Sequence, residues 1–280
     1  MSIFLNLMLW LAAASHGGWQ NPGPSVTGAT AATGSAVPTY VQANGSASLG
    51  STGAAFGSSV THGDAVYAWL FDGSNASDTI AFTDTMGNTW NVLTSGGMAS
   101  SGYTVNAATD GDAMALGCAV VTAATGADTV KFTVNGSGSV GAAVVIYEAS
   151  SATCTLDATT SPSGGFTTSD TSFTSPVTSG SITTTTNNDL MLMLAGNVHN
   201  RAGPPNSLQM SVSSPFSNVA CETYNPSNAF TCTPGSSADG VNIGMTMRVL
   251  ATAGASSGSI SVTNPGAAME YGVVYVAFKP

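Results

Sequence analysis

The chain has 280 residues, of which only 6% are charged, and four Lys and Arg against fourteen Asp and Glu give a net charge of −10. Nucleic-acid binding by phosphate neutralisation requires clusters of basic residues, so this composition excludes it as a main role. Soluble domains average about 25% charged residues, and here the polar surface has to come mostly from Ser, Thr, Gly and Asn.

The chain begins with an apolar run, IFLNLMLWLAAA, at residues 3–14. A membrane-spanning helix needs about 20 apolar residues, so no membrane span is expected. A helix of this length would be about 18 Å long and apolar all round, so it must be buried against a partner. We expect residues 1–15 to form an anchor that docks on other proteins or on copies of the chain through Ile3, Phe4, Leu5, Leu7, Met8, Leu9, Trp10 and Leu11.

Two alternatives for this segment stay open. The run resembles the core of a signal peptide that ends in small residues at 12–14, although no Lys or Arg precedes it. It could also pack back on its own domain, across a linker rich in Gly, Pro, Ala and Thr at residues 16–37.

From residue 38 to 280 the pattern is that of an all-β protein. Short runs rich in β-branched and aromatic residues alternate with turn signals such as Gly87-Asn88 and Asp110-Gly111, at the spacing typical of a sandwich or barrel. We expect strands near residues 40–43, 65–71, 79–83, 89–93, 113–121, 129–134, 142–147, 181–184, 190–195, 208–212, 219–224, 241–250, 259–263 and 272–278.

The sequence indicates that one β unit is built twice. Residues 141–149 and 271–280 both read as strands covered on two faces, and each follows a shorter alternating strand. Residues 59–66 also resemble 181–191, and 121–126 resemble 250–255. We expect one antiparallel, jelly-roll-like β-sandwich domain at 38–280 with halves at about 38–150 and 180–280; two consecutive small sandwiches are the alternative.

No stretch is assembled for catalysis, and we expect no enzyme. Gly254-Ala-Ser256-Ser-Gly258 matches the G-x-S-x-G nucleophile elbow, but that elbow needs a helix after it, and a strand-like stretch follows. Glu148 and Glu270 could form a glycosidase pair, yet their matched placement on repeated strands explains them better. Loop positions with no chemical task are expected for the histidines, His16, His62 and His199.

No cofactor is expected. The oxygen-rich turns at residues 72–78 and 110–112 could hold Ca²⁺, with plain turns as the simpler interpretation. The four cysteines lack the spacing of a zinc site. Cys221 and Cys232 flank a loop and could form a disulfide, which would indicate an oxidising environment; unpaired buried cysteines are equally compatible with the pattern. Trp69 and Trp90 are expected in the core.

Residues 83–90, Thr-Asp-Thr-Met-Gly-Asn-Thr-Trp, and the strand ends at 144–150 and 273–280 resemble a diffuse group of Gly/Ser/Thr-rich β-sandwich proteins of phage virions and bacterial surfaces. That group has a "TDxxGNTW"-like turn and a terminal "VAFKP"-like strand. The resemblance covers about residues 38–280, concerns architecture and carries no catalytic residues. The first 18 residues look like the uncleaved N-termini of some phage structural proteins.

We therefore expect a non-enzymatic virion structural protein, either a head decoration protein or a tail-fibre component. Its partners would be other virion proteins and copies of itself, with host-surface glycans as a further possibility. The alternative is a secreted bacterial adhesin or carbohydrate-binding module with a cleaved signal peptide.

Overall fold

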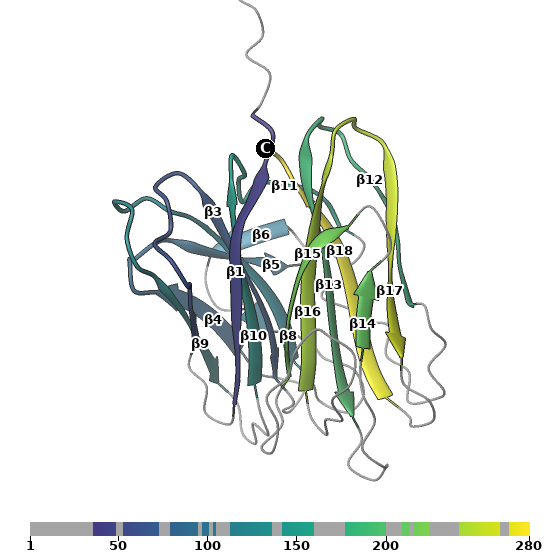
Figure 1. Ribbon diagram of the computed structural model, residues 1–280, viewed down its shortest axis with the longest axis horizontal. Helices are drawn as coiled ribbons and strands as arrows, with labels where there is room; N and C mark the ends of the chain where they lie inside the picture. The colour runs from purple at the N-terminus through teal and green to yellow at the C-terminus, as the bar shows by residue number, and fades with distance from the viewer. Residues whose placement is uncertain are drawn as a thin grey trace, which may run out of the picture. The chain divides into compact units, whose positions relative to one another are not determined.

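The computed structural model describes residues 36–48, 53–72, 79–94, 97–100, 103–104, 113–135, 142–159, 177–199, 209–212, 216–223, 241–263 and 269–280. They belong to one compact unit, Ser35–Pro280 (Figure 1). The anchor predicted at residues 1–15 and nearly all of the linker lie outside the described residues.

Every regular element described is a β-strand, which confirms the all-β class, and none of the described residues forms an apolar helix that could cross a membrane. The strands are β1 (Thr39–Ser48), β2 (Gly53–Ala55), β3 (Ala65–Asp72), β4 (Thr79–Asp84), β5 (Trp90–Thr94), β6 (Gly97–Ser100), β7 (Tyr103–Thr104), β8 (Ala113–Val120), β9 (Thr129–Asn135), β10 (Ala142–Ser150), β11 (Leu156–Thr159), β12 (Val177–Thr183), β13 (Asp189–His199), β14 (Gln209–Val212), β15 (Ser217–Thr223), β16 (Val241–Leu250), β17 (Ala255–Thr263) and β18 (Met269–Phe278).

The strands form four antiparallel sheets, two from each half of the chain. The first half gives an inner sheet with strand order β1-β10-β3-β8-β5-β6 and an outer sheet with order β2-β9-β4-β7. The second half gives an inner sheet with order β11-β18-β13-β16-β15 and an outer sheet with order β12-β17-β14. In Figure 1 the first half runs from purple to teal and the second from green to yellow.

Alternation along β3 shows why the inner sheets need cover on both sides. Ala65, Tyr67 and Trp69 point into a core shared with the second inner sheet, whereas Val66 and Leu70 point into a separate core under the first outer sheet. Successive side chains of a strand point to opposite faces, so β3 is buried on both, as is β10. The described residues therefore stack as four layers, outer, inner, inner and outer.

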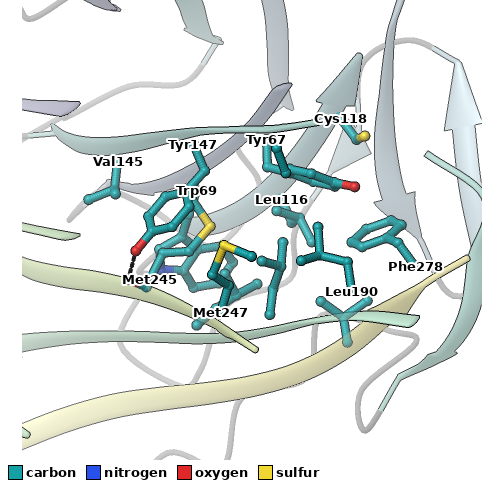
Figure 2. Close-up of a cluster of buried hydrophobic side chains, with 14 of the residues drawn as sticks. Tyr67, Trp69, Leu116, Cys118, Val145, Tyr147, Leu190, Met245, Met247 and Phe278 are labelled. Atoms are coloured by element: carbon teal, nitrogen blue, oxygen red, sulfur yellow. Dashed lines mark hydrogen bonds between the residues drawn. The ribbon is translucent and has the colours of Figure 1, made fainter. Parts of the chain in front are cut away.

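The shared core between the two inner sheets contains large aromatic and sulfur-containing side chains (Figure 2). Tyr67 contacts Phe278 across it, with ring centroids 4.9 Å apart. Tyr147 crosses from the first half and donates a hydrogen bond of 2.9 Å to the main-chain oxygen of Met245. Tyr147 is fully buried, so this bond joins the two halves inside the core.

The two halves repeat the same strand order. β1, β10, β3, β8 and β5 of the first inner sheet correspond in position to β11, β18, β13, β16 and β15 of the second, and β2, β9 and β4 correspond to β12, β17 and β14. Backbone registers agree: Asp64 lies opposite Val121 just as Asp189 lies opposite Leu250. The second half includes β11, which begins well before residue 180.

The jelly-roll detail of the sequence prediction is not confirmed. A jelly roll of two interleaved halves would mix their strands within a sheet, whereas each described sheet takes its strands from one half. The physical reason lies in the central strands, whose two apolar faces can each be covered by a separate sheet. Stacking the halves therefore covers both faces of these strands without interleaving them.

We predict that Tyr147→Phe destabilises the domain by about 1–2 kcal/mol, because the buried hydrogen bond to Met245 is lost while the ring is kept. Chemical denaturation followed by tryptophan fluorescence measures this. Tyr40→Phe is the matched control: Tyr40 packs edge-on against Tyr147 but is 37% exposed, and the change should cost under about 0.5 kcal/mol. Equal losses in both variants would contradict the role of the buried bond.

Candidate functional site

The motif at residues 83–90 forms a closed turn between β4 and β5. The carboxylate of Asp84 accepts hydrogen bonds from the backbone N–H and side-chain amide of Asn88 and from Nε1 of Trp90, each 2.9 Å long. Gly87 has a φ of 74°, a conformation that glycine adopts without strain. Asn88 in turn accepts the backbone N–H of Thr122 at 2.9 Å.

Asp128 joins this turn to the strand beside it. Its Oδ1 accepts hydrogen bonds from the backbone N–H and the hydroxyl of Thr85, at 3.2 and 3.0 Å, while its buried Oδ2 has no partner. Burial and the nearby charge of Asp84 raise the pKa of Asp128, and the hydrogen bonds from Thr85 and Thr129 partly oppose this. The motif is thus a structural turn that seats Trp90 in the core, where it is 6% exposed.

We predict that Asp84→Ala destabilises the domain by about 3 kcal/mol, because three N–H donors lose an ionised acceptor. The measurement is the free energy of unfolding in urea. Thr83→Ala is the control, since Thr83 precedes Asp84 on β4 and its side chain is exposed. A loss for Asp84→Ala no larger than that for Thr83→Ala would rule out the turn as a structural anchor.

In the first half, two carboxyl groups meet where β3 begins. Asp64 directly precedes β3, and Glu148 lies on the neighbouring β10 with no exposed surface. Glu148 accepts hydrogen bonds from Nε2 of Gln42 at 2.5 Å and from the backbone N–H of Thr61 at 2.8 Å. Burial, a hydrogen bond to Glu148 and the charge of Glu148 raise the pKa of Asp64 to about 6.

The second half holds a comparable pair. Asp189 begins β13 and is fully buried, and its two carboxyl oxygens have no N–H or hydroxyl partner. Asp157 accepts backbone N–H groups of Thr185 at 2.5 Å and Thr186 at 3.2 Å, a hydroxyl bond from Thr185, and lies 3.5 Å from Nζ of Lys279.

The two carboxyl groups of this pair have opposite pKa shifts. Burial acts to raise the pKa of Asp157, but the hydrogen bonds from Thr185, Asp189 and Thr186 lower it to about 2. Burial and the contact with Asp157 raise the pKa of Asp189 to about 7, with Lys279 acting against them. At neutral pH the proton of this pair therefore resides mainly on Asp189.

Ser256 of the G-x-S-x-G motif lies inside strand β17 rather than on a strand-to-helix elbow. It is 6% exposed, its Oγ lies 2.6 Å from the hydroxyl of Tyr275, and it accepts a hydrogen bond from Nη2 of Arg248. The guanidinium of Arg248 also lies 5.2 Å from the centre of the Phe216 ring. These side chains form an internal polar cluster between the second inner and outer sheets, and Ser256 has the geometry of a packing residue.

A disulfide joins Cys118 of β8 to Cys154, which lies between β10 and β11, with a Cα–Cα distance of 5.7 Å. Cys118 is fully buried in the shared core. The bond thus links an inner strand of the first half to the segment that leads into the second. Cys221 lies on β15 but its side chain is outside the described set, as is Cys232, so the Cys221–Cys232 bond stays a prediction.

We predict that the double variant Cys118→Ala/Cys154→Ala is less stable by about 4 kcal/mol, the chain-entropy value for a loop of 36 residues. Alkylation without reductant, followed by peptide mass analysis, should leave both cysteines of the wild type unlabelled. As the control, reductant should lower the stability of the wild type toward that of the variant. Labelling of either cysteine in the folded, unreduced protein would contradict the bond.

The suggested equivalence of Glu148 and Glu270 is wrong. Ala65, which follows Asp64, pairs with Ala149, and Leu190, which follows Asp189, pairs with Phe278. Ala149 therefore corresponds to Phe278, and Glu148, one residue earlier, corresponds to Ala277. Glu270 pairs with Val198, near the opposite end of β18.

The histidines and turn acids are only partly described. The Nδ1 atom of His62, whose side chain is exposed, lies 3.2 Å from the main-chain oxygen of Ala123. His199 ends β13, with its side chain outside the described set, and His16 is not described. The turns at 72–78 and 110–112 also fall almost wholly outside, so the calcium prediction stays untested there. Within the described ranges no three His, Cys, Asp or Glu side chains gather as a metal site would require.

The structure confirms that Trp69 and Trp90 are buried, as the sequence predicted. The carboxyl pairs and the cluster of side chains around Arg248 were not predicted. One signal for the pairs was present. In each half an aspartate stands directly before a continuously apolar strand and follows a residue with positive φ, Gly63 at 90° and Asn188 at 65°. Gly and Asn are the residues that adopt this conformation most readily.

No family model, no curated protein and no solved structure matches this chain.

Proposed function

We propose that this chain is a non-enzymatic structural protein of a virion, either a head decoration protein or a tail-fibre component. Its apolar N-terminal residues 3–11 would dock on other virion proteins or on copies of the chain. The doubled β-sandwich would then be displayed outward with a surface that carries few charges.

One observation carries the proposal: the side chains best suited to chemistry take part in internal contacts. Glu148 has no exposed surface and is held by Gln42 and Thr61, and Ser256 is enclosed by Tyr275 and Arg248. Trp90, which could otherwise stack on a sugar, is bonded to Asp84 in the core. Groups used in this way stabilise a scaffold, and a rigid scaffold is what a decoration or fibre protein supplies.

We predict that deletion of residues 1–20 lowers the number of copies in purified particles to near zero and leaves the sandwich folded. The reason is that an apolar segment without a partner cannot remain in water. Quantitative mass spectrometry of particles measures occupancy, and circular dichroism checks the fold. Deletion of residues 21–35, which keeps the apolar run, is the control and should retain occupancy.

Unchanged occupancy after deletion of residues 1–20 would remove the docking role. The intact mass of the native protein and its sedimentation add an independent criterion. A chain that keeps Met1 and sediments in a large assembly supports the proposal, whereas a monomer cleaved near Ala14 contradicts it.

The second candidate is a secreted bacterial adhesin or carbohydrate-binding module. The disulfide between Cys118 and Cys154 favours it, because such bonds persist in oxidising environments outside the cytosol. It would bind glycans saturably through the rims of the sandwich, and a glycan array combined with the N-terminal mass separates it from the virion protein.

A further inference from the structure

We propose that each half of the sandwich holds one proton between two buried carboxyl groups, Asp64 with Glu148 and Asp189 with Asp157, and that losing these protons loosens the strand ends they join. The folded domain would then be more stable at mildly acidic pH than at pH 8. This inference does not depend on the proposed function.

The hydrogen bonds assign different tasks to the two members of each pair. Glu148 and Asp157 each accept hydrogen bonds from neighbouring strands or loops, including backbone N–H groups, and those on Asp157 favour its ionised form. Asp189 has no such donor on either oxygen although it is fully buried. A buried carboxyl group without donors is costly when charged, so the proton of the second pair belongs on Asp189. In the first pair, burial and the contact with Glu148 favour the protonated form of Asp64.

The arrangement occurs twice, and its two copies are not simple repeats of one another. Asp64 and Asp189 occupy the same place at the start of the central inner strands. Their partners differ, since Glu148 lies on β10 whereas Asp157 lies at a register irregularity of β11. The two halves therefore supply the partner carboxyl group from different strands. Simple duplication of one pair would have placed both partners on corresponding strands.

The other charged groups at each pair are few. Nζ of Lys279 lies 3.5 Å from Asp157 of the second pair, and its charge acts against the burial and the Asp157 contact that raise the pKa of Asp189. Among the described residues of the first half, Glu148 is the charged group whose contact raises the pKa of Asp64, after burial, and Nδ1 of His62 lies 3.2 Å from the main-chain oxygen of Ala123. Asp128, which accepts hydrogen bonds from Thr85 of the turn at residues 83–90, also has a raised pKa and contributes with the same sign.

The sign follows from proton linkage. Asp64 and Asp189 have pKa values of about 6 and about 7 when folded, against 3.8 as the ordinary value. Between these limits the native state binds more protons than the unfolded state, so stability falls as pH rises. The stabilisation by these groups is present below about pH 4 to 5 and is lost as pH passes through 6 and 7. Asp157, whose pKa is lowered from 3.8 to about 2, acts oppositely, because its contribution is present above about pH 4 and is lost as pH falls through about 2.

The test measures the unfolding equilibrium constant of the full chain in urea at pH 5 and pH 8. For the wild type we expect this constant to rise by roughly 10-fold through Asp64 and roughly 100-fold through Asp189. Asp64→Asn and Asp189→Asn keep a hydrogen-bond donor but cannot ionise. Each should remove its own share of the pH dependence, and the double variant should be the more stable protein at pH 8.

Lys131→Gln is the control, because it removes one charge at an exposed position of β9 and should leave the pH dependence between pH 5 and pH 8 unchanged. Proton uptake on refolding at pH 5.5, measured potentiometrically, gives a readout that needs no variant to fold. We expect Asp64 and Asp189 to account for about two protons in the wild type, one fewer in each single variant. Wild-type stability that is flat or rises from pH 5 to pH 8, no proton uptake, or a double variant as pH-dependent as the wild type would overturn the proposal.

Discussion

The structure depends on the burial of both faces of its two inner sheets. Once β3 and β10 are covered by an outer sheet on one side and by the second half on the other, no face of these strands can hold an unpaired polar group without cost. Buried polar side chains are then either hydrogen-bonded, as Tyr147 and Ser256 are, or placed at strand ends and turns. Asp64 and Asp189 stand where β3 and β13 begin, and the turn anchored by Asp84 lies between β4 and β5.

This constraint also explains which parts of the fold could be predicted. Strands with two apolar faces have a strong local signature, as in residues 142–147 and 272–278, and both were located correctly. The repeat was visible because β10 and β18, which occupy corresponding places in the two inner sheets, have similar apolar patterns and each follows a shorter alternating strand. Local pattern carries no information about which sheet covers which face, so stacking in four layers could not be told from interleaving. The short strands β2, β6, β7 and β11 were missed because strands of so few residues show no clear alternation.

The contacts that matter for a site join residues far apart in sequence, and that is why they escaped prediction. Cys118 and Cys154 meet only because β8 and the end of β10 lie in the same inner sheet. Glu148 and Asp157 find their aspartates through strand pairing that no spacing rule encodes. The resemblance to virion and surface proteins indicated architecture, and the turn it quoted proved to be held by Asp84, Asn88 and Trp90.

The shared core shows how two repeated halves became different from one another. Registers place Tyr67 and Trp69 at the positions that Leu192 and Leu194 occupy in the second half, so the first half contributes the larger side chains there. At the strand ends the order is reversed, because Ala65 and Ala149 correspond to Leu190 and Phe278. Tyr67 can contact Phe278 across the core because each is larger than the residue at the corresponding position of the other half, Leu192 and Ala149 respectively.

Such exchange lets large side chains of one half pack beside smaller ones of the other, as a densely packed core requires. It also makes the core-facing side of one inner sheet complementary in shape to that of the other inner sheet, and neither side is complementary to a second copy of itself. Two copies of the first half would bring Tyr67 and Trp69 together with Tyr67 and Trp69, and would leave the alanine positions unfilled. The halves therefore specify each other as partners, and the sandwich needs both in one chain to bury its inner sheets.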